Sequence, residues 1–175
     1  MYCETTTGHA AAKFFRMQQA LPPRDLPPDL LARLPAPAAF AVRGSASALP
    51  QVPGAYLLLL RLDQAHPLDI ATLPPAILPP GWYAYAGSAR GPGGLRARLG
   101  RHFREDKPAH WHIDRLTPAA AALVGLAYLA EEECALVLRL IATGAFRARL
   151  RGFGASDCRT CESHLLNWTA VGAPD

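Results

Sequence analysis

Two apolar runs, each containing tyrosine, stand out in the middle of the chain. The first covers residues 56–62, and an apolar run of this length between polar residues predicts a central strand. The second covers residues 82–87 and alternates so that Tyr83 and Tyr85 lie on one face of a strand. We therefore predict that the two strands pair as an antiparallel hairpin joined by a long connector.

A basic, amphipathic segment follows the second run after a glycine-rich turn. Residues 95–103 place Leu95, Leu99 and Phe103 on one stripe, which is the spacing of a helix with one apolar face. Arg98 and His102 lie one turn apart beside that stripe. The sequence thus predicts a helix that presents a guanidinium and an imidazole next to the sheet.

Three further elements are predicted towards the C-terminus. They are a short helix at residues 110–116, a strand at residues 123–130 and a helix at residues 131–141. The last helix begins with acidic residues and carries Arg139 near its end, which complements the helix dipole. The predicted fold class is therefore α+β, with a small, mainly antiparallel three-stranded sheet flanked by helices.

The N-terminal third differs from the rest in composition. Six prolines between residues 22 and 37 interrupt any long helix, and residues 44–47 are typical of a linker. We expect residues 1–52 to form a proline-rich extension, either partly disordered or docked on the domain, and residues 53–170 to form the folded domain. One domain suits a chain of 175 residues.

The positive charge is concentrated in two segments. Residues 90–107 hold six basic and two acidic residues, and residues 139–159 hold five arginines and one aspartate, so each segment carries +4. The whole chain also carries only +4, so the remainder is net acidic. Arginine suits phosphate contacts because its planar fork binds two oxygens. The alternative is that both segments are ordinary solvated helix faces.

The compartment is inferred from three features. No stretch reaches the ~20 apolar residues that span a membrane. The first twenty residues lack the apolar core of a signal peptide, and four cysteines do not form the framework of a secreted disulfide-rich protein. We expect a cytoplasmic protein without membrane contact; the sequence does not fix the oligomeric state.

Several short motifs, in order along the chain, resemble the GIY-YIG nuclease superfamily. Gly-Ala-Tyr at residues 54–56 stands where its first triplet lies, and Tyr-Ala-Gly at residues 85–87 where its second lies. Residues 95–102 resemble its following helix, in which an arginine and a histidine lie four apart. The middle residue of each triplet is alanine instead of isoleucine, and the loop at Gly91 is longer than in many members. Motifs of one small branch occur at Gly87, Trp111, Glu133 and Phe153.

The resemblance implies metal-dependent hydrolysis of nucleic-acid phosphodiesters, with DNA favoured over RNA. Tyr56 would be the general base or orient the water, and Tyr85 would hydrogen-bond the water or the phosphate. Arg98 would clamp the scissile phosphate, and His102 would bridge to it or protonate the leaving oxygen. If each residue is considered alone, the alternative for each tyrosine is an ordinary strand residue. The alternative for His102 is a histidine that is hydrogen-bonded near the core. Further expected nucleic-acid contacts are Ser88, Arg90, Arg96, Arg101, His112 and Asp114.

Two metal sites are considered. Mg²⁺ or Mn²⁺ needs oxygen ligands, and Glu133 lies on the helix seam that should face the sheet. Cys158, Cys161 and His164 form Cys-x2-Cys-x2-His, but zinc needs four ligands. Cys134 or His112 could supply the fourth ligand. The alternatives for this motif are a structural Zn²⁺ site, reduced buried thiols and a local redox pair.

The leading interpretation is a divalent-metal-dependent endonuclease in DNA repair or processing. One alternative is a non-catalytic nucleic-acid-binding module that uses the same arginines without a metal. Another is a zinc-stabilised interaction domain, in which the cysteines matter more than Tyr56.

Overall fold

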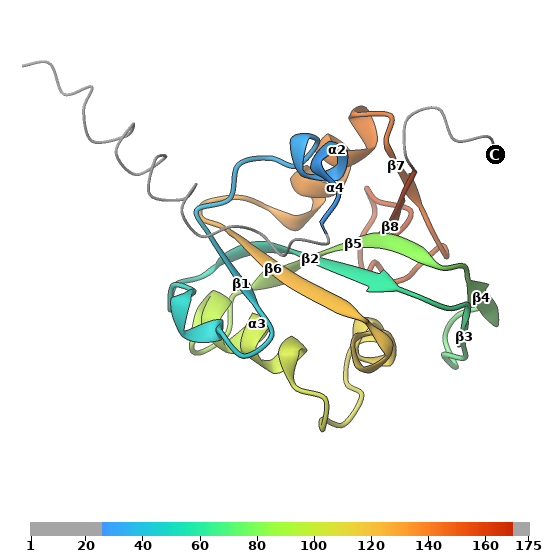
Figure 1. The fold of residues 1–175 in the computed structure, drawn as a ribbon, viewed down its shortest axis with the longest axis horizontal. Coiled ribbons are helices and arrows are strands. Elements are labelled where there is room, and N and C mark those ends of the chain that lie inside the picture. The colour runs from blue at the N-terminus through green and yellow to red at the C-terminus, as the bar shows by residue number, and fades with distance from the viewer. Residues whose placement is uncertain (1–25, 170–175) are drawn as a thin grey trace, which may run out of the picture.

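A six-stranded antiparallel sheet forms the centre of the protein in a computed structural model that describes residues 26–169. The strand order is β1-β6-β2-β5-β8-β7, so the two tyrosine-bearing strands β2 and β5 lie side by side in the middle. A separate hairpin, β3-β4, lies at one end of the sheet (Figure 1). The strands are β1 (Ala39–Val42), β2 (Gly54–Leu62), β3 (His66–Leu68), β4 (Ala76–Leu78), β5 (Gly81–Ala89), β6 (Ala122–Tyr128), β7 (Phe146–Ala148) and β8 (Leu165–Trp168).

Helices cover both faces of the sheet (Figure 1). Helix α3 packs on one face together with Tyr56 and Leu58 of β2, and helix α4 packs on the other face with Leu57 and Leu59. Because both faces of β2 are buried, its sequence is almost continuously apolar instead of alternating. The helices are α2 (Pro28–Ala32), α3 (Gly94–Phe103) and α4 (Glu133–Ala142), with 3-10 turns η1 (Ala46–Ala48), η2 (His112–Arg115) and η3 (Thr117–Ala119).

The long elements agree with the sequence prediction. The three predicted strands correspond to β2, β5 and β6, and β2 pairs antiparallel with both β5 and β6. Helix α3 buries Leu95, Leu99 and Phe103 as expected. The mixed helix-and-strand class is confirmed, but the prediction of three strands was wrong. The three additional strands of the main sheet, β1, β7 and β8, have only three or four residues each, too few to show a period.

Part of the predicted extension belongs to the folded unit. Helix α2 buries Leu30, and β1 pairs with β6 at the edge of the sheet. The turn η1 packs against both β1 and α3, and Leu49 directly after it is fully buried. Residues 26–52 therefore pack as part of the domain, which begins well before residue 53. Residues 1–25 of the predicted extension, like residues 170–175, lie outside the described residues.

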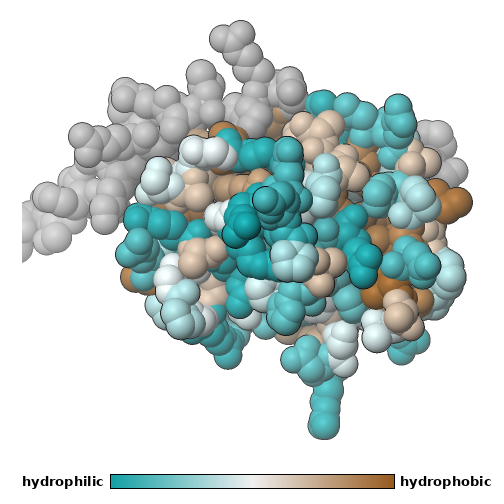
Figure 2. All heavy atoms as spheres, turned by 90° about the horizontal axis from the view of Figure 1, so that it is seen from below, coloured by the Kyte–Doolittle hydropathy of each residue, from teal (hydrophilic) through white to brown (hydrophobic). Residues whose placement is uncertain are grey.

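The surface on the α3 side is mainly hydrophilic (Figure 2). Within residues 26–169 no helix has both the length and the apolar character needed to cross a membrane.

Replacing Leu30 by alanine should destabilise the whole domain. Its side chain is fully buried in the apolar cluster that also contains the buried residues of α4, so the cavity left behind should lower the free energy of unfolding by about 3 kcal/mol. The matched control is Leu31→Ala on the same helix, whose side chain is 40% exposed and should change little. Urea denaturation measures both. Equal midpoints for the two variants would mean that residues 26–52 do not contribute to the fold.

Candidate active site

The phenol of Tyr56 lies flat across the neighbouring strand. Tyr56 on β2 is in register with Gly87 on β5. A Cβ at Gly87 would lie 2.4 Å from the Tyr56 hydroxyl oxygen, closer than any real contact allows. The glycine of the second triplet is therefore required so that the Tyr56 side chain can cross β5. This explains why the two triplets occur together.

Tyr56 is joined to α3 by a buried hydrogen bond. Its hydroxyl lies 2.8 Å from Nε2 of His102, and Nδ1 of His102 faces Oδ1 of Asp114 at 3.6 Å, an electrostatic contact longer than a hydrogen bond. Burial lowers the pKa of His102 despite the nearby carboxylate, which favours the neutral imidazole. The carboxylate beside Nδ1 favours the tautomer with its proton there. In that state Nε2 accepts the hydrogen bond from Tyr56.

The same burial keeps Tyr56 protonated. Its pKa is raised well above 10.0, first by burial and then by the neighbouring Tyr85. A phenol in this state cannot serve as a base by prior ionisation at neutral pH. It can accept a proton only if its own proton moves on to His102 at the same time. The contact thus forms a potential path for a proton from the site to the buried imidazole.

Asp114 holds this part of the site together. Nη1 of Arg101 donates to both of its carboxylate oxygens at 3.0 and 2.9 Å, and the backbone N–H groups of His110 and Trp111 donate at 2.9 Å each. Burial alone would raise the pKa of Asp114, but His102, these N–H groups and Arg101 together lower it well below its usual range. The buried carboxylate therefore stays charged and fixes η2 against α3.

Trp111, placed by this contact, orients Arg98. The centre of the Arg98 guanidinium lies 4.0 Å from the centroid of the indole, and that of Arg101 lies 4.3 Å from it. Such cation–π stacking holds the guanidinium plane but leaves its N–H groups available. Within the described part of the chain no carboxylate pairs with Arg98. Its charge is therefore available to an anion in the adjoining cavity.

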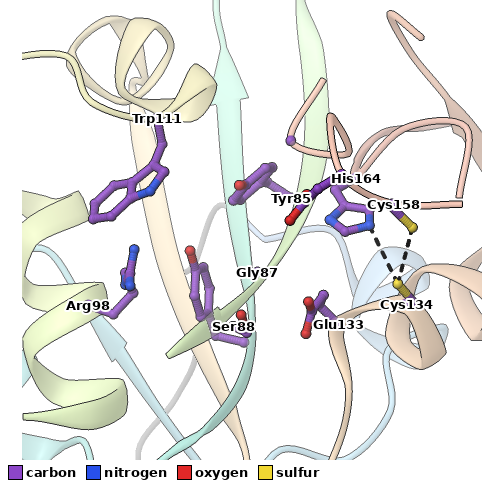
Figure 3. A pocket seen from close by; sticks show the side chains of 12 residues that line it. Tyr85, Gly87, Ser88, Arg98, Trp111, Glu133, Cys134, Cys158 and His164 are labelled. Atoms are coloured by element: carbon purple, nitrogen blue, oxygen red, sulfur yellow. Dashed lines mark hydrogen bonds between the residues drawn. The ribbon is translucent and has the colours of Figure 1, made fainter. Parts of the chain in front are cut away.

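Four of the five predicted catalytic residues line one cavity of about 460 Å³, namely Tyr56, Tyr85, Arg98 and Glu133. Arg98 and Trp111 lie on one side of it, Glu133 and Cys134 lie on the other, and Tyr85 lies between them (Figure 3).

Glu133 begins α4 at the end of the sheet. Its Oε2 atom is buried, and among the described residues it has no hydrogen-bond partner. Val137 and Leu140 on the same helix seam are buried against the sheet, as the sequence pattern predicted. A buried carboxylate oxygen without a partner is costly, so this position favours a bound cation or a hydrogen-bond donor.

The loop before β8 closes the cavity. Gly154 has a φ of +67°, and a Cβ there would lie 2.6 Å from the ring of Tyr85. Its N–H donates to Nδ1 of His112 at 3.0 Å, so His112 ties η2 to this loop. Burial raises the pKa of Tyr85 to about 12, so both phenols in the cavity are protonated at neutral pH.

Other predicted contacts have different roles in the structure. His102 is 1% exposed behind Tyr56, so the prediction that it touches the phosphate or the leaving oxygen does not fit its position. Arg96 donates from Nε to the Leu49 carbonyl at 2.7 Å, and exposed Arg90 pairs with Glu132. Arg101 is occupied by Asp114, and Ser88 does line the cavity.

Apart from glycines, two residues that line the cavity were not among the predicted site residues. Trp111 was noted only as part of a motif, although Arg98 and Arg101 lie three apart on α3 and both stack on it. Asp157 also lines the cavity, and the signals for it were its place next to Cys158 and its position in the motif that begins at Phe153.

Four potential metal ligands meet at the edge of the cavity. Sγ of Cys134 lies 3.5 Å from Sγ of Cys158 and 3.7 Å from Nε2 of His164 (Figure 3). With Cys161, the four ligand atoms all lie within 4.8 Å of one another, a cluster that could hold a metal ion such as zinc. Of the two residues considered for the fourth ligand, Cys134 is therefore the one in place. His112 instead bonds to Gly154.

Residues 55–174 match the family described as domain of unknown function DUF123, which covers more than half of the chain. The chain belongs to the DUF123 family. A search of curated proteins and a search of solved structures each gave no match. Within the described residues, the DUF123 match includes β2, β5, α3 and α4, and thus every residue that lines the cavity.

Replacing Asp114 by asparagine should destabilise the protein and disturb the site. The change removes the charge that pairs with Arg101 and faces His102, so we expect a loss of about 3 kcal/mol in the free energy of unfolding at neutral pH. Asp106→Asn is the matched control, because Asp106 forms an exposed pair with Arg104. Urea denaturation at pH 7 is the measurement. Similar small losses in both variants would contradict a central role for Asp114.

Proposed function

We propose that the protein is a divalent-cation-dependent endonuclease that hydrolyses phosphodiester bonds, with DNA as the favoured substrate and repair or processing as its setting. The proposal combines the resemblance to the GIY-YIG superfamily with one structural observation. That observation is the convergence of two phenols, a stacked guanidinium and an unpaired carboxylate on one cavity.

The charges in the cavity suit a phosphate. Arg98 offers N–H donors on one side, and charge-assisted hydrogen bonds to phosphate oxygens are among the strongest available to a protein. The guanidinium is held by Trp111 before any ligand arrives, so little reorganisation is needed as negative charge develops. Tyr85 can donate from its protonated hydroxyl to the same phosphate or to the attacking water.

Tyr56 and His102 provide a route for the proton of the attacking water. As the water oxygen forms its bond to phosphorus, the bond from phosphorus to the leaving oxygen breaks, and the leaving oxygen takes a proton from solvent. At the same time the proton of the attacking water passes to the Tyr56 oxygen. The Tyr56 proton passes along the 2.8 Å contact to Nε2 of His102. The resulting imidazolium faces the charged Asp114. Asp114 is therefore a positioning residue that stabilises this charge, and His102 acts from behind Tyr56.

Glu133 is the proposed ligand of the divalent cation. Its unpartnered Oε2 and the oxygen atoms of a phosphate in the cavity match the ligands that Mg²⁺ or Mn²⁺ prefers. When bound, such a cation would lower the pKa of a coordinated water and offset charge on the phosphate. The carboxylate and Arg98 thus occupy opposite sides of the proposed substrate position.

Cleavage should require both sides of the cavity. With Mg²⁺ or Mn²⁺, the purified protein should cut at least one DNA in a panel of branched, abasic, mismatched and single-stranded substrates. Arg98→Ala and Glu133→Gln should each reduce the rate by about 100-fold or more, since each removes a charge that faces the phosphate or cation. The matched controls are Arg104→Ala and Glu132→Gln, which change exposed residues outside the cavity.

Wild-type rates in both cavity variants would exclude this site. Salt-sensitive DNA binding that ignores chelators, with no cleavage of any substrate, would instead support the non-catalytic binding module.

The cleavage rate should fall as the pH drops below 6.5. Burial lowers the pKa of His102 from 6.5, and protonation removes the acceptor that Tyr56 needs. The same shift predicts that stability contributed by neutral His102 is complete above pH 6.5 and is lost as the pH falls towards its folded-state pKa. Rates between about pH 5 and 8, and thermal unfolding of wild type and His102→Gln over that range, test both statements. A wild-type protein whose stability falls no more than that of the variant would contradict them.

A further inference from the structure

The cysteine–histidine cluster beside the cavity has the dimensions of a zinc site. A tetrahedral zinc ion with bonds of about 2.3 Å to sulfur and 2.0 Å to nitrogen separates its ligand atoms by roughly 3.5–3.8 Å. Cys134 Sγ lies 3.5 Å from Cys158 Sγ and 3.7 Å from His164 Nε2. These two distances agree with a common centre, and all four ligand atoms lie within 4.8 Å of one another. A disulfide between the two sulfurs would require about 2 Å.

Backbone hydrogen-bond donors hold the sulfur of Cys158, the kind of contact that orients a metal ligand. The backbone N–H groups of Thr160 and Cys161 both donate to its Sγ, at 3.4 and 3.2 Å. The tight turn that contains Cys158 and Cys161 thus brings two sulfurs and two N–H donors to one place. His164 and Cys161 are largely buried, at 5% and 9% exposure.

The ligands come from two segments that are distant in the sequence. Cys134 lies in the first turn of α4, whereas the other three lie in the loop between β7 and β8. Cys134 directly follows Glu133, and Cys158 directly follows Asp157. Both acidic residues line the cavity. Any bond that joins the cluster therefore fixes the backbone of the acidic side of the site.

We propose that Cys134, Cys158, Cys161 and His164 bind one Zn²⁺ in a closed tetrahedral site that holds Glu133 in position for the divalent cation. The zinc ion supplies no chemistry to the substrate, because four protein ligands complete its coordination. It cross-links the start of α4 to the loop that carries Asp157 and Gly154. The positioning part of this inference rests on the proposed function, whereas the zinc site itself does not.

Metal analysis tests the site without any need for activity. Protein purified under reducing conditions from zinc-supplemented cells should contain one zinc per chain, and Cys161→Ser should contain roughly none. Cys3→Ser changes a cysteine outside the proposed ligand set and is the matched control, which should retain the zinc. His164→Ala should lose zinc, but His164→Cys should retain it, since four cysteines also form zinc sites. Cobalt(II) in the wild-type site should give the strong visible absorption of tetrahedral thiolate coordination. Zinc-free wild-type protein, or a cysteine-to-cysteine disulfide in its place, would overturn the site.

Manganese binding tests the positioning role. Electron paramagnetic resonance of free Mn²⁺ should reveal a site in zinc-loaded protein that Glu133→Gln abolishes. If the Cys161→Ser variant remains folded, as judged by circular dichroism, its affinity for Mn²⁺ should fall roughly 10-fold or more. The His164→Cys variant should keep the wild-type affinity for Mn²⁺. Unchanged Mn²⁺ affinity in folded, zinc-free protein would overturn the positioning role. Absence of Mn²⁺ binding in zinc-loaded wild type would overturn the proposed cation site, while the zinc content decides the zinc site separately.

Discussion

The buried contact between Tyr56 and His102 is the interaction on which the rest of the site depends. It requires glycine at position 87, because any side chain there would occupy the space of the phenol. It also requires α3 to pack closely on the sheet, and it leaves an imidazole inside the protein next to Asp114. A buried carboxylate is tolerated only when it is fully paired, and Arg101 and two backbone N–H groups provide that pairing. One contact between a strand and a helix thus accounts for several otherwise separate features.

The cavity has two sides that are built in different ways. The basic side is preorganised by stacking, since the indole of Trp111 holds Arg98 and is itself positioned through Asp114. The acidic side carries Glu133 with an unpartnered oxygen, an arrangement that costs free energy unless something binds there. Among the described residues no hydrogen-bond donor meets this oxygen, which lies in the first turn of α4. The cysteine–histidine cluster lies next to this side, which the proposed zinc ion would cross-link to the β7–β8 loop.

The sequence allowed prediction of the parts that depend on local pattern. The apolar run of β2, the alternation of β5 and the apolar stripe of α3 are long enough to be recognised, and these three elements carry Tyr56, Tyr85 and Arg98 of the cavity. Short edge strands such as β1, β7 and β8 show no such period and are defined by their partners. Arg96, Arg98 and Arg101 could not be distinguished by charge alone. Their roles depend on distant partners, namely the Leu49 carbonyl for Arg96, Trp111 for Arg98 and Asp114 for Arg101. The choice of Cys134 over His112 as a ligand depended in the same way on the packing of the β7–β8 loop.

The protonation states of Tyr56 and His102 limit how the proposed nuclease could remove a proton from the attacking water. A tyrosine with a strongly raised pKa is a poor base on its own, and placing a positive charge nearby is the usual remedy. Arg98 lowers the pKa of Tyr56, but burial outweighs it. The remaining remedy is a proton acceptor behind the phenol, and a neutral His102 at 2.8 Å is one. Burial raises the pKa of Tyr56 and lowers that of His102. Before the reaction the proton therefore stays on Tyr56, and the lone pair of His102 is free to receive it.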